Sequence, residues 1–498
     1  MTLLSKILMP AQSEINAAEL ARLEWLADEE KAIQKTILRA RDYHEGEQLT
    51  FLTARLKEFL DVPGDVTFRL NVCRPVVSAI TERLAVLGFD VPGGDVQGAD
   101  GETTNPQADW AWGVWQANRM DEMQDVVHTG AIRDREFFVI VDWDETTRTP
   151  RFTPHQRYTD PQVDGDGDGC KAFYANDDPH QELLYVAKRW TEDYTDANGK
   201  AKTRQRQTLY FPDRVEKYVL VSGKWELFTG DGDGGVVEWK DAAGKPIGIA
   251  ARHFRNKDLR PEATDAFPLQ DGINKSYIDF LATMDTAALR ILYTLGFVPT
   301  SDGKPLASDQ SNAARLTAGV LISTPKSASE TAVGAIEPTD PTKLLDAIDR
   351  QIMYVAAVTD TPVSRFQFTR QVAAEGTLKQ QSEPLFAKIE KRQVLLGNGW
   401  EDCMSIARRL ANWKANAGFD EALEFQTRWA SLSARTVDEQ KTEAEGKKAS
   451  GVPTEQIWRD VWGYDEKTIA QMKATDEFQA RVALMQSGLE AMKAQGNG

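Results

Sequence analysis

The 498-residue sequence predicts an α+β fold in which one β-rich segment is inserted into a mostly helical chain. Three patterns indicate this. Short strand-like runs alternate with turn clusters between about residues 137 and 249. Two helical patterns, 267–295 and 340–359, bracket a short irregular segment, and a still longer helical pattern follows at 377–413. The length suggests two to four domains, and 41% hydrophobic residues with 13 Trp allow substantial cores.

The charge balance restricts the partners of this chain. The formal net charge is −17, and the pI is about 5.0. Tight, sequence-independent binding of nucleic acid needs clustered Lys and Arg, so the average surface does not grip DNA. An acidic wall is still compatible with DNA that slides past it. No run of apolar residues is long enough to predict a membrane span, and no signal peptide is predicted. The three cysteines, Cys73, Cys170 and Cys403, are far apart, which favours buried reduced thiols.

The first third of the chain reads as three helices and the start of the β-rich segment. An amphipathic helix is expected over 13–41, interrupted at 43–46, and a second over 71–87, stopped by Gly88. A third helix is expected over 109–133. The apolar run 137–143 has strand length and β-branched bias, and further strands are expected at 183–190, 207–211 and 215–221.

The middle of the chain carries the helix pair. Pro268 suits the first turn of the helix 267–295, which would span about 40 Å. The segment 297–339 is irregular, with a short strand expected at 319–323. Asp340 and Pro341 fit the N-cap and first position of the next helix, which ends before Thr361-Pro362.

A loop at 362–376 leads into the longest helix. Residues 377–380 have the form of a capping box, and Pro384 and Gly397 predict a bend. A strand is expected at 424–429, and the charged tail 438–495 reads as short helices.

A search for catalytic chemistry predicts a protein that is not an enzyme and has no cofactor. Walker A, HExxH and GxSxG spacings do not occur. Asp164, Asp166 and Asp168 match the first half of a calcium loop, but the twelfth position is Ala175, which favours an acidic turn. Asp142 and Asp144 follow a strand, as metal ligands of nucleases do, yet no Lys or His motif accompanies them.

Several segments together resemble one family. Residues 69–77 and 82–89 contain Asn71, Arg74 and Glu82-Arg83-Leu84, residues 43–46 precede them, and Trp115–Asp121 leads to His128. The segments 254–256, 268–275, 356–362 and 376–385 continue the pattern. In this order and spacing they resemble the portal proteins of siphophage-type tailed bacteriophages, over about 43–469. Glu375-Gly376 stands where the family has Ser-Gly.

The resemblance implies a phage portal fold and a ring oligomer, usually of twelve subunits, at one capsid vertex. It implies a mixed α/β wing at 1–265, a first stem helix at 266–296, a small α/β clip at 297–339 and a second stem helix at 340–360. A tunnel loop at 361–376, a long wing helix at 377–416 and a helical C-terminal crown with its tail at 417–498 complete the chain. DNA would pass through the ring during packaging and ejection.

The resemblance also implies partners and a location. The terminase large subunit would dock first and the head-completion adaptor proteins later, while the major capsid protein and scaffolding protein would surround the ring. Contact with double-stranded DNA would be transient, and no membrane is involved. The expected location is the portal vertex of the virion, with assembly in the host cytoplasm. A metal-dependent nuclease using Asp142 and Asp144 and a capsid scaffold or adaptor protein are the alternatives.

Polar residues of the tunnel loop and stem are the candidate functional side chains. Arg365 and Arg370 either touch DNA phosphates transiently or form salt bridges between subunits. The loop candidates are Arg365, Gln367, Arg370 and Gln371, and the stem-channel candidates are Asn274, Lys275, Asp279, Arg290, Lys343 and Arg350.

Overall fold

The computed structural model describes residues 28–48, 69–97, 103–159, 168–196, 199–287, 291–295, 300–301, 304–305, 332–336, 340–366, 375–432 and 437–464, with single positions at 468–469, 471–472 and 475. The chain divides into two compact units. One comprises Met1–Gln48, Asn71–Phe267 and Ala356–Gly498 and is called the body here. The other, Leu49–Leu70 with Pro268–Val355, is called the helix-pair unit.

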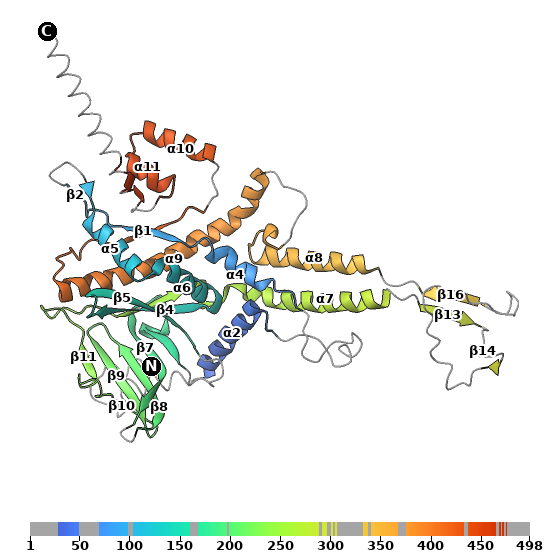
Figure 1. The fold of residues 1–498 in the computed structure, drawn as a ribbon, viewed down its shortest axis with the longest axis horizontal. Helices are drawn as coiled ribbons and strands as arrows, with labels where there is room; N and C mark the ends of the chain where they lie inside the picture. The colour runs from blue at the N-terminus through green and yellow to red at the C-terminus, as the bar shows by residue number, and fades with distance from the viewer. Residues whose placement is uncertain are drawn as a thin grey trace, which may run out of the picture. The chain divides into compact units, whose positions relative to one another are not determined.

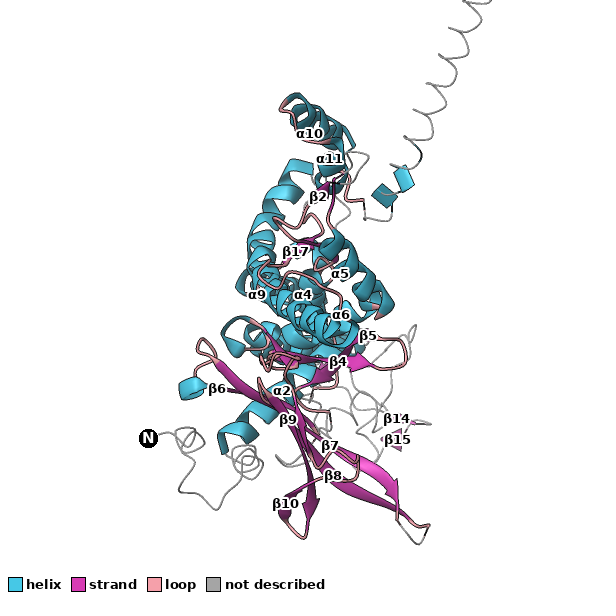
Figure 2. Ribbon diagram, turned by 90° about the vertical axis from the view of Figure 1, so that its left-hand side faces the viewer, coloured by secondary structure: helices cyan, strands magenta, loops and turns pink. Residues whose placement is uncertain are grey.

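Helices surround the centre of the body (Figures 1 and 2). They are α2 (Asp28–Glu45), α4 (Cys73–Thr81), α5 (Pro106–Ala117), α6 (Met120–Asp134) and α9 (Glu375–Ala415). The 41-residue α9 confirms the predicted long helix and carries Pro384 inside it. Its buried side contacts the strands β4, β5 and β12. Trp115 and Trp400 are fully buried there, with ring centroids 4.9 Å apart in an edge-on arrangement.

Two antiparallel sheets form the β part of the body. A three-stranded sheet has the order β12 (Ala251–Arg255), β4 (Glu136–Asp144), β5 (Thr149–Gln156). The larger sheet has the order β10 (Lys224–Leu227), β9 (Arg214–Val221), β8 (Ala201–Tyr210), β7 (Leu183–Thr195), β6 (Gly169–Tyr174), and β11 (Val236–Glu238) also pairs with β9 (Figure 2). These strands confirm the predicted β-rich segment. The strand predicted at 183–190 is longer than expected, because β7 continues to Thr195, which still pairs with Ala201.

Two predicted helices of the body were wrong in extent. The helix expected over 71–87 ends at Thr81, and β1 (Val86–Asp90) instead pairs with β17 (Gln426–Trp429). The backbone hydrogen-bonding groups of β1 pair with a strand some 340 positions downstream. Local periodicity cannot reveal so distant a partner. The helix expected over 109–133 is two helices, because Arg119 adopts a left-handed φ of 53° between α5 and α6.

The helix-pair unit contains α7 (Phe267–Ala287), α8 (Pro341–Val358) and four short strands. The prediction of α8 is confirmed. The helix expected over 267–295 is wrong at its end, since β13 (Ile291–Leu295) pairs with β16 (Ala332–Ile336). Ile, Tyr and Thr suit a strand once a partner exists. β14 (Thr300–Ser301) pairs with β15 (Lys304–Pro305). The strand expected at 319–323 lies outside the described residues.

The remaining elements are short. β2 (Val96–Gln97) pairs with β3 (Thr103–Thr104), and α10 (Val437–Ala449) and α11 (Thr454–Asp460) follow β17, as the charged tail predicted. Single turns of 3-10 helix are η2 (Ala175–Asp177), η3 (Lys257–Leu259), η4 (Glu262–Ala266) and η6 (Val363–Arg365). Among the helices of the described residues, none has the length and apolarity that crossing a membrane requires.

Candidate channel elements and their anchors

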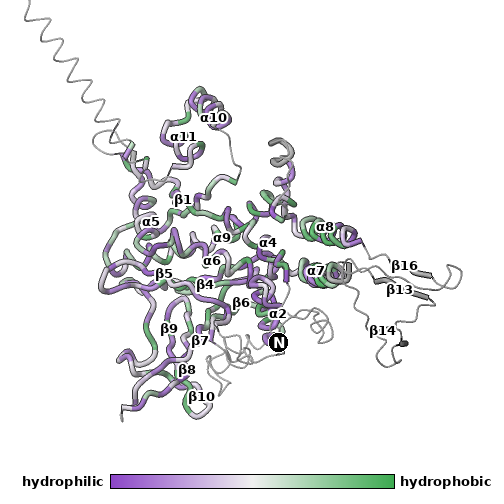
Figure 3. The backbone as a smooth tube through the Cα atoms, turned by 45° about the vertical axis from the view of Figure 1, so that its right-hand side comes forward, coloured by the Kyte–Doolittle hydropathy of each residue, from purple (hydrophilic) through white to green (hydrophobic). Residues whose placement is uncertain are grey.

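The helices α7 and α8 lie side by side and antiparallel (Figures 1 and 3). Hydrophobic residues recur along both helices (Figure 3). A side-chain hydrogen bond joins the helices, in which Gln351 Nε2 donates to Ser276 Oγ at 3.1 Å. The two helices are therefore a packed pair and not two independent rods. The buried apolar residues of the pair are Ile273, Ile278, Ile348, Ile352 and Val355.

The predicted stem residues fall into different environments. Asn274 is buried, and its side-chain oxygen accepts hydrogen bonds from the Leu70 amide at 3.0 Å and from Gln270 Nε2 at 3.0 Å. We therefore assign Asn274 a structural role within the helix-pair unit. Lys275 and Asp279 are exposed and paired at 2.8 Å one turn apart on α7. Lys343 and Arg350 are exposed on α8, and Arg290 lies outside the described residues.

A buried carboxylate of the body lies in the segment that leads into α7. Glu262 lies in η4, directly before α7, and its oxygens contact Lys388 at 3.0 Å and Arg392 at 2.7 Å, both on α9. Burial opposes ionisation of Glu262, but the charges of Lys388 and Arg392 outweigh it and lower its pKa. Lys388 also donates to the Thr359 carbonyl at the end of α8. Within the body, one lysine therefore contacts both the segment before α7 and the residue that follows α8.

No sequence pattern predicted the contact between Glu262 and Lys388. Glu262 and Lys388 are separated by more than a hundred residues, and neither stands in a motif that the search for chemistry singled out. Only the packing of η4 against α9 brings them together.

Arg365 is held by its own chain. It ends η6, and its guanidinium contacts the carboxylate of Glu82. Arg83 is next to this pair, and burial together with the charge of Arg365 lowers its pKa. The pair therefore lies at the start of the predicted tunnel loop, with a second arginine nearby that donates to the Ala79 carbonyl. The other loop candidates, Gln367, Arg370 and Gln371, lie outside the described residues.

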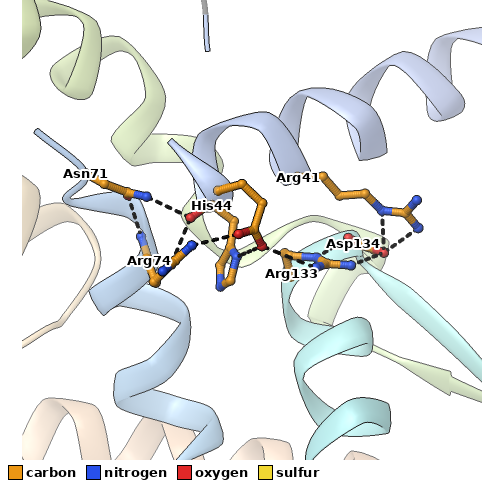
Figure 4. Close-up of polar contacts among 7 residues, drawn as sticks. Arg41, His44, Asn71, Arg74, Arg133 and Asp134 are labelled. Atoms are coloured by element: carbon orange, nitrogen blue, oxygen red, sulfur yellow. Dashed lines mark hydrogen bonds and ion pairs between the residues drawn. The ribbon is translucent and has the colours of Figure 1, made fainter. Parts of the chain in front are cut away.

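Two of the motifs that carry the resemblance contact one another (Figure 4). The Asn71 side chain donates to the His44 carbonyl at 2.7 Å, and Arg74 donates to the same oxygen at 3.1 Å. Arg74 also contacts Glu45 at 2.7 Å. Gly46 has a φ of +79°, and a Cβ there would meet Asn71 Nδ2 at 3.3 Å. The end of α2 is thus fixed onto the start of α4.

A third helix joins this cluster through acidic and basic side chains (Figure 4). Asp134, at the end of α6, is buried and accepts from Arg41 Nη2 at 2.6 Å and from Arg133 Nε at 2.7 Å. Arg41 also donates to the Tyr158 carbonyl at 2.8 Å. These contacts satisfy a buried carboxylate and connect α2, α6 and the end of β5. Their role is to hold the body together.

His128 is another motif residue with a structural role. Its ring is fully buried, with Nδ1 at 2.9 Å from the Leu84 carbonyl, and Nε2 accepts from Trp400 Nε1 at 2.9 Å. These two partners fix a neutral imidazole with the proton on Nδ1. Burial lowers the pKa of His128 to about 3.

The acidic candidates do not assemble a metal centre in the described part of the chain. Asp168 accepts from the Thr191 amide at 2.9 Å, and Asp164 and Asp166 lie outside the described residues. Asp144 accepts from the Thr146 and Thr147 amides at 2.8 and 3.2 Å, which fixes the turn after β4. Asp142 accepts from the Trp143 amide at 2.8 Å. No group of three or more potential ligands occurs among the described residues.

Comparison with known proteins identifies the class of this chain as the phage portal proteins. The family model described as phage portal protein, SPP1 Gp6-like, matches residues 96–481, and the chain belongs to this family. It is similar to the portal protein of Mycobacterium phage D29, with 25% identity over 513 residues that cover 96% of this chain and 92% of the relative. It is also 25% identical to the portal protein of Mycobacterium phage L5, over 82% of this chain and 79% of the relative.

Membership of the family fixes the function. The chain is a structural component of the virion, the connector between head and tail that provides the channel for DNA, and it is not an enzyme. The family works as an oligomeric ring with capsid and packaging partners. The nuclease and scaffold alternatives are set aside on this ground.

Proposed function

We propose that twelve copies of this chain close into a ring at one capsid vertex and that α7 and α8 form its stem. The observation that carries the proposal is the antiparallel pair itself: two helices, joined by a hydrogen bond between Gln351 and Ser276, that bracket a strand-containing segment. A head-to-tail contact repeated by rotation closes into a ring and lines a central channel with such a pair.

The division of the chain follows from this assignment. Residues 1–265 with 377–416 form the wing, and 417–498 form the crown. The clip comprises 297–339 together with β13, because β13 pairs with β16. The clip would dock the terminase large subunit during packaging and the head-completion adaptors afterwards. The wing would face the major capsid protein and scaffolding protein.

Charged side chains on the outer faces of the stem would meet or flank the DNA. Lys275 and Asp279 on α7 are exposed and remain candidates, as does Arg290. Lys343 and Arg350 on α8 are also exposed, and their role is taken up in the next section. A channel wall that carries both positive and negative side chains, in a chain of net charge −17, would let DNA pass without binding it tightly.

For the tunnel loop, we propose that Arg365 and Arg370 touch DNA phosphates in passing. In the isolated chain Glu82 holds the Arg365 guanidinium, which is 30% exposed. Phosphate would then compete with Glu82 for a cation that is already oriented. The alternative is a purely structural role for Arg365 in its pair with Glu82. A DNA-packaging assay distinguishes the two roles.

The ring is tested by electron microscopy and mass determination on the purified chain, alone and with scaffolding protein. Turbine-shaped rings of about twelve copies support the proposal. A compact dimer under both conditions refutes it. For the loop, Arg365→Ala with Arg370→Ala should slow packaging, while Arg260→Ala, an exposed arginine paired with Asp265, should not. Normal packaging by the double variant would remove the role in DNA contact.

A further inference from the structure

The outer face of α8 is unusually apolar for a surface helix. Met353 is 48% exposed, Tyr354 is 59% exposed and Val358 is 51% exposed. All three lie in the last two turns of the helix. Because large exposed apolar groups gathered on one element mark an interaction surface, this face is expected to be covered in the assembled protein.

The same face carries two charged stripes of opposite sign. One stripe runs from Asp346 through Asp349 to Met353, at successive spacings of three and four residues. It is acidic at its start and apolar at its end. Lys343, Arg350 and Tyr354 follow one another at spacings of seven and four residues, so the other stripe is basic at its start and apolar at its end. On a helix of 3.6 residues per turn the stripes are centred about 90° apart. We call them the acidic stripe and the basic stripe.

Within the described chain these four charges make no ion pair, although their spacing allows it. Asp346 lies three residues from Lys343 and four from Arg350, yet no such contact occurs within 4.0 Å. On α7 the corresponding pair, Lys275 and Asp279, does form, at 2.8 Å. The acceptors and donors of both stripes are therefore available to another molecule.

We propose that the acidic stripe of α8 in one copy packs against the basic stripe of α8 in the next copy, with Met353 and Tyr354 closing the same seam. The inference rests on the proposed ring and names the residues that close its stem. The two signs lie on different flanks of one helix, which suits a head-to-tail contact repeated around a ring. DNA is a poorer occupant, because two carboxylates beside the two cations would repel phosphate.

The experiment reverses each stripe separately. In D346K/D349K all four charges of the face become positive, and in K343D/R350D all four become negative. In each variant alone, the affinity of one copy for the next should fall about tenfold, because two ion pairs become two repulsions. A much smaller fraction should be found in rings by native mass measurement. K275D/D279K, which reverses a pair already satisfied within α7, should assemble as the unmodified chain does.

Rescue distinguishes the seam from a folding defect. Mixing the two variants should restore rings in which positive and negative copies alternate, which an even number of subunits permits. The fourfold variant with all charges exchanged should also form rings. Rings from each double variant alone, or folded variants that neither mixing nor exchange rescues, would overturn the inference. Intact rings with altered packaging would assign the face to DNA instead. If the unmodified chain forms no ring either alone or with scaffolding protein, the proposed function fails as well.

Discussion

Acidification should destabilise the body through His128 in particular. The neutral ring donates from Nδ1 to the Leu84 carbonyl and accepts from Trp400 at Nε2, so a second proton would break the latter bond and place a charge in a fully buried site. The pKa is about 3 in the folded chain against an ordinary value of 6.5. Because the folded pKa is depressed, the unfolded chain binds the proton first, and stability falls as pH drops below about 6.5.

The size of the effect follows from the two pKa values. Between pH 7 and pH 5 the unfolded chain gains about 0.7 of a proton at this position, while the folded chain gains almost none. The free energy of unfolding should therefore fall by about 2 kcal/mol from His128 alone. His44, His155 and His253 also have lowered pKa values, mainly through burial, and add to the total loss.

The assay is denaturant unfolding at pH 7 and pH 5 of the unmodified chain and of His128→Gln, which retains an acceptor for Trp400 but cannot titrate. The variant should start about 1–3 kcal/mol less stable at pH 7, because the Leu84 carbonyl loses its donor. It should then lose about 2 kcal/mol less than the unmodified chain on acidification. His180→Gln, at an exposed histidine, serves as the control. An equal loss in His128→Gln and the unmodified chain would refute the reasoning.

Two further predictions concern packing of the body. Lys388→Met removes a cation from buried Glu262 and a donor from the Thr359 carbonyl, and should cost about 3–5 kcal/mol in chemical denaturation. Lys391→Met, at an exposed position of the same helix, should change stability by less than about 0.5 kcal/mol, and equal effects would contradict the anchor. Gly130→Ala would place a Cβ 2.1 Å from Phe137 Cδ2 and should lower the free energy of unfolding by about 1–3 kcal/mol. Gly113→Ala, with no atom within 4 Å of its Cβ, should raise it by about 0.5–1 kcal/mol, so thermal unfolding should move in opposite directions for the two variants.

The sequence by itself determined the class of fold, the helices with strong local signals and the family. Asp340-Pro341 begins α8 as predicted, because an N-cap and a proline act within one turn. The long α9 and the strand β4 were likewise visible from periodicity and residue type. Acidic composition and the ordered motifs around Asn71 and Arg74 led to the portal family, which the family match confirmed.

Only the tertiary structure decided which segments, far apart in the sequence, pair as strands. Val86–Asp90 and Ile291–Leu295 read as helix ends, but each is a strand because β17 and β16 return from far along the chain to pair with it. The anchor between Glu262 and Lys388 and the neutral tautomer of His128 arise in the same way. The physical reason is range: capping and periodicity act over a few residues, whereas strand pairing, burial and ion pairing depend on neighbours that only folding supplies.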